Sequence, residues 1–158
     1  MRLAENMKIV PLTNDAGYSG ALTMDSVNMR NHRHADVVII CKNVTGNSAL
    51  KVYSGATAAA KTTAMIFDYA IGSGTVGSSS ADVLGSTSTA VAASGMTLTA
   101  SSVSSAMTVL SIDAAQMDTA NGHEWMTVEI DSTASSGSCT AVAILDPRYT
   151  SDKSATAI

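Results

Sequence analysis

The chain has 158 residues, enough for one domain with a single hydrophobic core. Its formal net charge is −4 and only 14% of its residues are charged, which excludes the basic surface typical of nucleic-acid binding. Charged residues interrupt the N-terminal stretch before it reaches signal-peptide length, and no window approaches the ~20 apolar residues of a membrane span. We therefore expect synthesis in a cytoplasm, with neither nucleic acid nor a membrane as partner.

The composition favours a core of small and branched side chains. Apolar residues make up 46% of the chain, but there is one Phe and one Trp, and the nine methionines are expected to fill gaps in the core. Ser, Thr, Ala and Gly dominate the middle of the chain, which is typical of an assembly subunit that packs flat against a neighbour. Cys41 and Cys139 are expected to be a reduced, buried pair, with a disulfide between them as the alternative.

Alternating patterns rich in β-branched residues predict strands along the whole chain. In chain order they are expected at residues 8–12, 21–29, 35–42, 48–53, 64–69, 81–90, 97–100, 107–112, 123–131 and 138–145. About ten short strands with one or two short helical turns predict an all-β fold of the β-sandwich, jelly-roll or barrel type. We expect one β domain at 8–148, with an N-terminal arm at 1–7 and a C-terminal tail at 149–158.

Two strands differ in their pattern. Residues 37–41 form a continuous apolar run, which predicts a central strand covered on both faces. In residues 125–131 apolar and polar residues alternate, which predicts a strand with one solvent-exposed face. Turns are expected at 43–47 and 132–137, so that the last two strands form a hairpin. Residues 72–105 are rich in Gly and Ser, but apolar residues recur too often in this segment for a solvated linker.

Two short stretches have helical features. Residues 56–63 are rich in Ala but lack an apolar stripe, so they are either a helix or an irregular surface segment. Residues 113–119 are expected to contain a single helical turn, in which Asp113 caps the start and Asn121 with Gly122 ends it.

The residues that could perform chemistry are few. The serines have only three histidines to activate them, and no Gly-X-Ser-X-Gly motif occurs. His32 and His34 would share one face of a strand and could share a metal, but a third ligand is missing nearby. Asp113, Asp118 and Asn121 offer oxygen atoms, but their spacing is not that of a calcium-binding loop. We expect no enzyme activity, no metal and no cofactor, and we expect a hydrogen-bonding role for His123.

The C-terminal half contains three recognisable short sequence motifs: SIDAAQMD at 111–118, NGHEWMTVEI at 121–130 and AVAILDPRY at 141–149. Together with a strand entered from an Asn-His segment at 29–40, they resemble a family of small tailed-phage proteins that decorate and cement the head. The resemblance covers about residues 8–148, although the middle third matches in composition alone.

The resemblance implies a non-enzymatic virion protein that binds the outer surface of the assembled capsid and stabilises it. Its partners would be the major capsid protein and copies of itself, as a dimer or trimer on the shell. The polar segment 30–34, interpreted as an exposed loop, and the chain termini would then contact these neighbours. The candidate contact residues are Arg30, His32, Arg33, His34, Arg148 and Tyr149.

Other functions stay open at this point. One is a tail, connector or fibre component of the same kind of particle, which would differ in copy number and in ring or trimeric assembly. A β-sandwich module that binds a cell-surface ligand is the next alternative, and the small number of aromatic residues argues against a sugar as that ligand.

Overall fold

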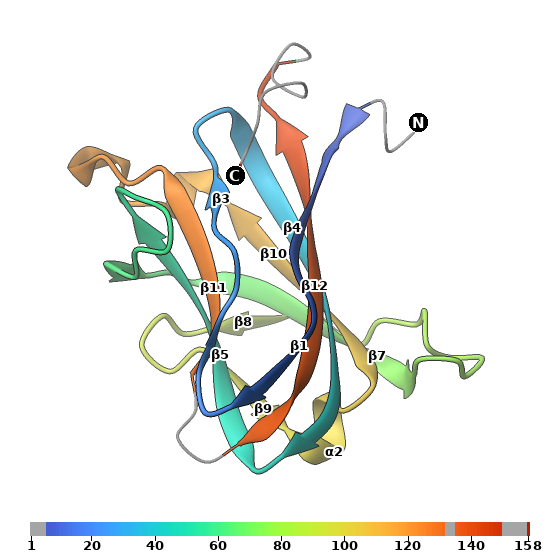
Figure 1. Cartoon of the computed structure of the whole chain (residues 1–158). Helices are drawn as coiled ribbons and strands as arrows, with labels where there is room; N and C mark the ends of the chain where they lie inside the picture. Colours follow the sequence, from blue (N-terminus) through green and yellow to red (C-terminus); the bar gives the residue numbers. More distant parts are fainter. Residues whose placement is uncertain (1–5, 132–134, 150–157) are drawn as a thin grey trace.

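The computed structural model describes residues 6–131, 135–149 and 158, and within them the chain forms two antiparallel sheets that face each other (Figure 1). Sheet A has the strand order β1-β12-β4-β10-β7-β8, and sheet B is built on β2-β11-β5-β6, with β3 and β9 paired to its central strands. The prediction of an all-β fold with few helical turns is therefore confirmed, and the arrangement is that of a β-sandwich.

Sheet A contains the longest strands. Its members are β1 (Lys8–Ser19), β12 (Ser136–Pro147), β4 (His32–Thr45), β10 (Ala106–Asp113), β7 (Phe67–Thr75) and β8 (Ser88–Ala90). Along β4, β10 and β12, buried residues alternate with partly exposed ones, because successive side chains of a strand point to opposite faces. One face of sheet A thus contributes to the core and the other is an outer face.

Sheet B is built from shorter strands around two central ones. It comprises β11 (Trp125–Asp131), β5 (Asn47–Gly55), β2 (Leu22–Thr23), β3 (Val27–Asn28), β6 (Thr63–Ala64) and β9 (Met96–Thr99). The chain passes from sheet A to sheet B at Gly46, between β4 and β5, where the positive φ of 69° is readily adopted by glycine.

The inner faces of both sheets share one hydrophobic core. Phe67 is fully buried at its centre, together with branched residues such as Ile39, Leu50 and Ile130. Six methionines are buried with them: Met24, Met29, Met65, Met96, Met117 and Met126. A core of small and branched side chains with methionine as filler is what the composition predicts.

Some predicted elements differ in the structure. The last two strands do not form a hairpin, because β11 pairs in sheet B with β5 and β12 pairs in sheet A with β1 and β4. The predicted strand at 21–29 is broken into β2 and β3, and most of 81–90 lies outside the regular strands, with only Ser88–Ala90 in β8. Of the two alternatives for residues 56–63, the structure has the irregular one, since residues 56–62 form turns and coil.

The helical segments are short. The predicted turn after β10 is present as the 3-10 helices η1 (Ala114–Gln116) and η2 (Thr119–Asn121). As expected, Asp113 caps η1 by accepting a hydrogen bond from the amide of Ala115 at 2.8 Å, and Gly122 ends η2 with a φ of 72°. The helix α2 (Ala100–Val103) lies where the sequence predicts the end of a strand.

The predictions for the faces of β4 and β11 are both wrong, in opposite directions. Val38 and Ile40, on the outer face of β4, are partly exposed, although this run was expected to be covered on both faces. Thr127 and Glu129, on the outer face of β11, are buried at 0% and 5% exposure. Their cover comes from Ser26 and from the 56–62 segment, both remote from β11 in sequence.

Candidate functional site

The predicted contact residues lie at one end of sheet A, and they are not all in a loop. Strand β4 begins at His32, so His32, Arg33 and His34 belong to the strand and only Arg30 lies in the preceding turn. His32 is 1% exposed, so its side chain belongs to the interior and not to an exposed loop. Tyr149, after the end of β12, is 71% exposed.

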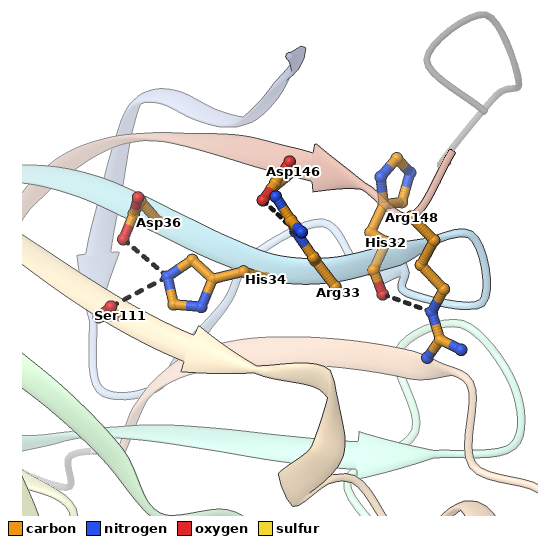
Figure 2. Close-up of polar contacts among 7 residues, drawn as sticks. All are labelled: His32, Arg33, His34, Asp36, Ser111, Asp146 and Arg148. Carbon is orange, nitrogen blue, oxygen red and sulfur yellow. Dashed lines mark hydrogen bonds and ion pairs between the residues drawn. The ribbon is translucent and has the colours of Figure 1, made fainter. Parts of the chain in front are cut away.

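Contacts between β4 and the end of β12 bring several of these residues together (Figure 2). Arg33 forms an ion pair with Asp146, and Arg148 donates from Nε to the carbonyl oxygen of His32 at 3.2 Å. The amide of Arg148 also donates to the carbonyl of Asn31 at 2.9 Å. These contacts fix Arg148 beside the turn that carries Arg30. No sequence pattern predicts that these two arginines lie close together.

His32 and His34 do not form a shared metal site. The pairing of β4 with β12 shifts by one residue between Asp146 and Pro147, so His32 turns into the core while His34 stays on the outer face. Among the residues that the structure describes, no group of three or more His, Cys, Asp or Glu side chains could hold a metal ion.

His34 lies between a serine and an aspartate, but the geometry differs from that of a catalytic triad. Its Nε2 atom is 3.1 Å from Asp36 Oδ1 and 3.0 Å from Ser111 Oγ, as Figure 2 shows. A triad needs the carboxylate on one ring nitrogen and the hydroxyl on the other, so that the base can remove the serine proton. Here both partners compete for the same nitrogen, and the cluster cannot activate Ser111 in that way.

The outer face of sheet A carries an unbroken apolar row across five strands. The cross-strand register joins Pro11 to Val142, Val142 to Val38, Val38 to Val109, and Val109 to Ala70. Ile9, Ile144, Ile40 and Met107 extend this row on either side. All nine side chains are partly exposed or exposed, with Ile9 at 45%. We call these nine residues the apolar face.

An acidic band borders the apolar face on one side. Asp36, Asp68, Asp113 and Asp146 lie on the outer face of sheet A, and the register places them in two adjacent rows with His34 and Ser111. Within the band, Arg33 neutralises one carboxylate through its ion pair with Asp146. On the opposite side of the apolar face lies Lys42, itself 3.8 Å from Asp15. The outer face of sheet A therefore combines an apolar centre with a negative edge.

No local sequence pattern distinguishes the apolar face from the core-facing side of the same strands. In β12, residues 141–145 (AVAIL) are all apolar, so the two faces of this part of the strand have similar hydropathy. The sequence nevertheless contains an indication of an exposed apolar face. Several central strands are apolar on both faces, and the chain has few aromatic side chains that could cover the outer set.

His123 has the hydrogen-bonding role that we expected. It is 5% exposed, and its Nδ1 atom lies 3.0 Å from the hydroxyl oxygen of Ser54, which is also buried.

Cys41 and Cys139 are free thiols that oppose each other in register, with their Sγ atoms 3.7 Å apart. The shared hydrogen bond and burial raise the pKa of the Cys139 thiol.

Comparisons with known proteins give no relative for this chain. No protein-family model, no curated protein and no solved structure matches it. In the described part of the chain, no helix is long and apolar enough to cross a membrane.

Proposed function

We propose that this chain is a non-enzymatic structural protein of a phage particle, which binds the outer surface of the assembled capsid and stabilises it. The observation that supports this most directly is the apolar face on the outside of sheet A. Monomeric proteins rarely expose contiguous apolar surface beyond a few hundred Å², and larger patches usually mark interaction sites.

The outer face of sheet A is large enough for a stable interface. Five strands about 4.8 Å apart, each roughly 30–45 Å long, cover on the order of 900 Å². A typical specific interface buries about 800 Å² on each partner. A sheet face of this size suits a shell surface, where many copies bind the same lattice and their contacts add up.

Charge favours the shell protein over a second copy as the occupant of this face. The acidic band has four carboxylates, whereas Lys42 on the other side already lies near Asp15. Two copies packed face to face would leave most of these carboxylates without a basic partner. The expected occupant is therefore an apolar strip of the capsid protein that is bordered by Lys or Arg. Copies of this chain would meet each other through other surfaces.

The first experiment is quantitative mass spectrometry of purified particles, which gives the copy number of this chain relative to the major capsid protein. A ratio near one, or a simple fraction of it, supports decoration of the lattice. A handful of copies per particle would instead indicate a tail, connector or fibre component, and absence from particles would overturn a virion role.

A variant of the apolar face tests the surface itself. Val38→Lys places a charge at the centre of the face, and we expect particle binding to fall at least about tenfold while the thermal unfolding midpoint changes little. The matched control is Ala49→Lys on the outer face of sheet B, which should bind normally. If the Val38→Lys variant binds particles as well as the wild-type chain does, docking through this face is contradicted. If the wild-type chain forms a stable dimer that the Val38→Lys substitution dissociates, the partner at this face is a second copy of the chain and not the shell protein.

A further inference from the structure

A small cavity lies at the end of the sandwich, between the turn before β4, the segment after η1, and the end of β12. Its volume is about 180 Å³, and the residues that matter for its chemistry are Met29, Arg30, Met117, His123, Glu124 and Arg148. Pockets for drug-sized ligands usually begin at roughly 300 Å³, so this one fits a group the size of a side chain.

His123 supplies a buried polar group that faces the cavity. The ring is 5% exposed and lines the cavity, and its Nδ1 is occupied by the hydroxyl of Ser54 at 3.0 Å. Within the described residues no group forms a hydrogen bond with Nε2. When Ser54 donates to Nδ1, the neutral ring carries its proton on Nε2, and this nitrogen is then a hydrogen-bond donor.

Two arginines line the same cavity. The backbone of Arg30 is held by a hydrogen bond from its amide to Asn28 Oδ1 at 2.9 Å, and that of Arg148 by the bond to Asn31 at the same distance. Arg148 uses Nε for the carbonyl of His32, as Figure 2 shows. Among the described residues, no hydrogen bond is made by its two terminal nitrogens. The guanidinium of Arg30 is 3.9 Å from Glu124.

The balance of charge and apolar surface selects the class of ligand. Two guanidinium groups and the carboxylate of Glu124 give the cavity a formal charge of +1, which matches a monoanion better than a phosphate dianion. Arginine pairs with carboxylates through parallel hydrogen bonds of suitable geometry. Met29 and Met117 are buried beside these polar groups and provide contact for a short aliphatic stem.

We propose that this cavity, here called the arginine pocket, binds the carboxylate of an acidic side chain or chain terminus that belongs to a neighbouring protein chain. Arg30 and Arg148 would bind the carboxylate, His123 would donate to it from Nε2, and the two methionines would contact the aliphatic stem. The neighbouring chain as source rests on the proposed structural role, but the pocket uses different residues from the apolar face, and its chemistry can be tested on the isolated protein.

The test is a nuclear magnetic resonance titration of the full-length protein at constant ionic strength. The probes are the peptide acetyl-Ala-Glu-Ala-amide, its Gln counterpart, free glutarate and inorganic phosphate. We expect the Glu peptide to shift the amide signals of Gly122 and Glu124 and the ring signals of His123, and we expect the Gln peptide to leave them unchanged. Arg30→Met and Arg148→Met should each weaken binding of the Glu peptide at least about fivefold.

The matched control is Arg33→Met, which removes an exposed arginine outside the pocket and should leave binding unchanged. Both pocket arginines are exposed at the surface, so their variants are expected to fold, and unchanged binding by both variants would overturn the proposal. Equal shifts with the Glu and Gln peptides, or tighter binding of phosphate, would overturn a carboxylate as the ligand. Much tighter binding of free glutarate than of the peptide would overturn a neighbouring chain as its source. Because no particle is involved, failure here leaves the capsid role untouched.

Discussion

The outer faces of the two sheets differ in both polarity and cover. On sheet A, Val38 and Ile40 of the central strand β4 are apolar and partly exposed. On sheet B, Thr127 and Glu129 of the central strand β11 are polar and buried, because the 56–62 segment lies against them. In that segment the amide of Ala59 donates to Ser26 Oγ at 2.6 Å, and Lys61 forms an ion pair with Glu129.

This difference shows which face is completed within the chain. On the outer face of sheet B, the buried Thr127 and Glu129 have hydrogen-bond partners in the same chain, as buried polar groups require. The apolar face of sheet A has no such cover among the described residues, and its burial would gain free energy from the hydrophobic effect. The outer face of sheet B is therefore covered within the chain, whereas the outer face of sheet A is suited to bind a partner.

Neighbouring isoleucines of β4 provide the sharpest test of this difference. Ile39 is 2% exposed and faces the core, whereas Ile40 faces outward. Ile39→Ala should lower the free energy of unfolding by about 3 kcal/mol, because it removes buried methyl groups and leaves a cavity, while Ile40→Ala should cost about 1 kcal/mol or less. Urea denaturation of both variants measures the two losses. Similar losses at the two positions would mean that the apolar face is already covered in the isolated chain.

Two lysines test the cover of sheet B. Lys61 pairs with Glu129, whose side chain is 7% exposed, whereas Lys51 pairs with Asp131, whose side chain is 45% exposed. In both cases the hydrogen bond to the carboxylate raises the pKa of the lysine. Lys61→Met should cost about 2 kcal/mol, because among the described residues it leaves the buried carboxylate of Glu129 with the hydroxyl of Thr23 as its one hydrogen-bond donor.

Lys51→Met is the matched control and should cost less than about 1 kcal/mol, since Asp131 remains in contact with water. Adding Glu129→Gln to the Lys61→Met variant should recover part of the loss, because it removes the buried charge. If the two lysine variants are equally stable by urea denaturation, Glu129 does not depend on the 56–62 segment, and that segment is not the cover we describe.

Local sequence patterns predict the strands well and their faces poorly. The strands around 37–41, 107–112 and 138–145 are present because period-two alternation and β-branched residues are local properties. Whether a face is covered depends on other segments. In β4 both alternating sets are apolar, so hydropathy cannot tell which one faces the core, and in β11 burial depends on Ser26 and Lys61, which are distant in sequence.

The same limit applies to the candidate sites. The cap at Asp113 and the stop at Gly122 are local signals, and they are found in the structure as predicted. The arginine pocket instead brings together Arg30 and Arg148 with the segment around His123, and this proximity depends on the register between β4 and β12. A one-residue shift in that register also separates His32 from His34, which their spacing alone places on one face.

Alkaline pH tests the core-facing side of sheet A. Burial, with smaller contributions from Cys41 and Cys139, raises the pKa of Tyr18 to about 12, so the folded state favours the protonated phenol. The stability gained from this preference is fully present below the ordinary tyrosine pKa of about 10 and is lost as the pH rises from 10 to about 12. At pH 11 the loss should be about 1.4 kcal/mol.

Tyr18→Phe should remove the part of this pH dependence that comes from Tyr18. Burial also raises the pKa of Tyr53 on the outer face of sheet B, so a smaller alkaline loss should persist in the Tyr18→Phe variant. Urea denaturation at pH 8, 10 and 11 separates these contributions. If Tyr18→Phe and wild type lose stability in parallel between pH 10 and 11, then Tyr18 ionises as readily in the folded chain as in the unfolded one, and the core does not extend under β1 as far as this residue.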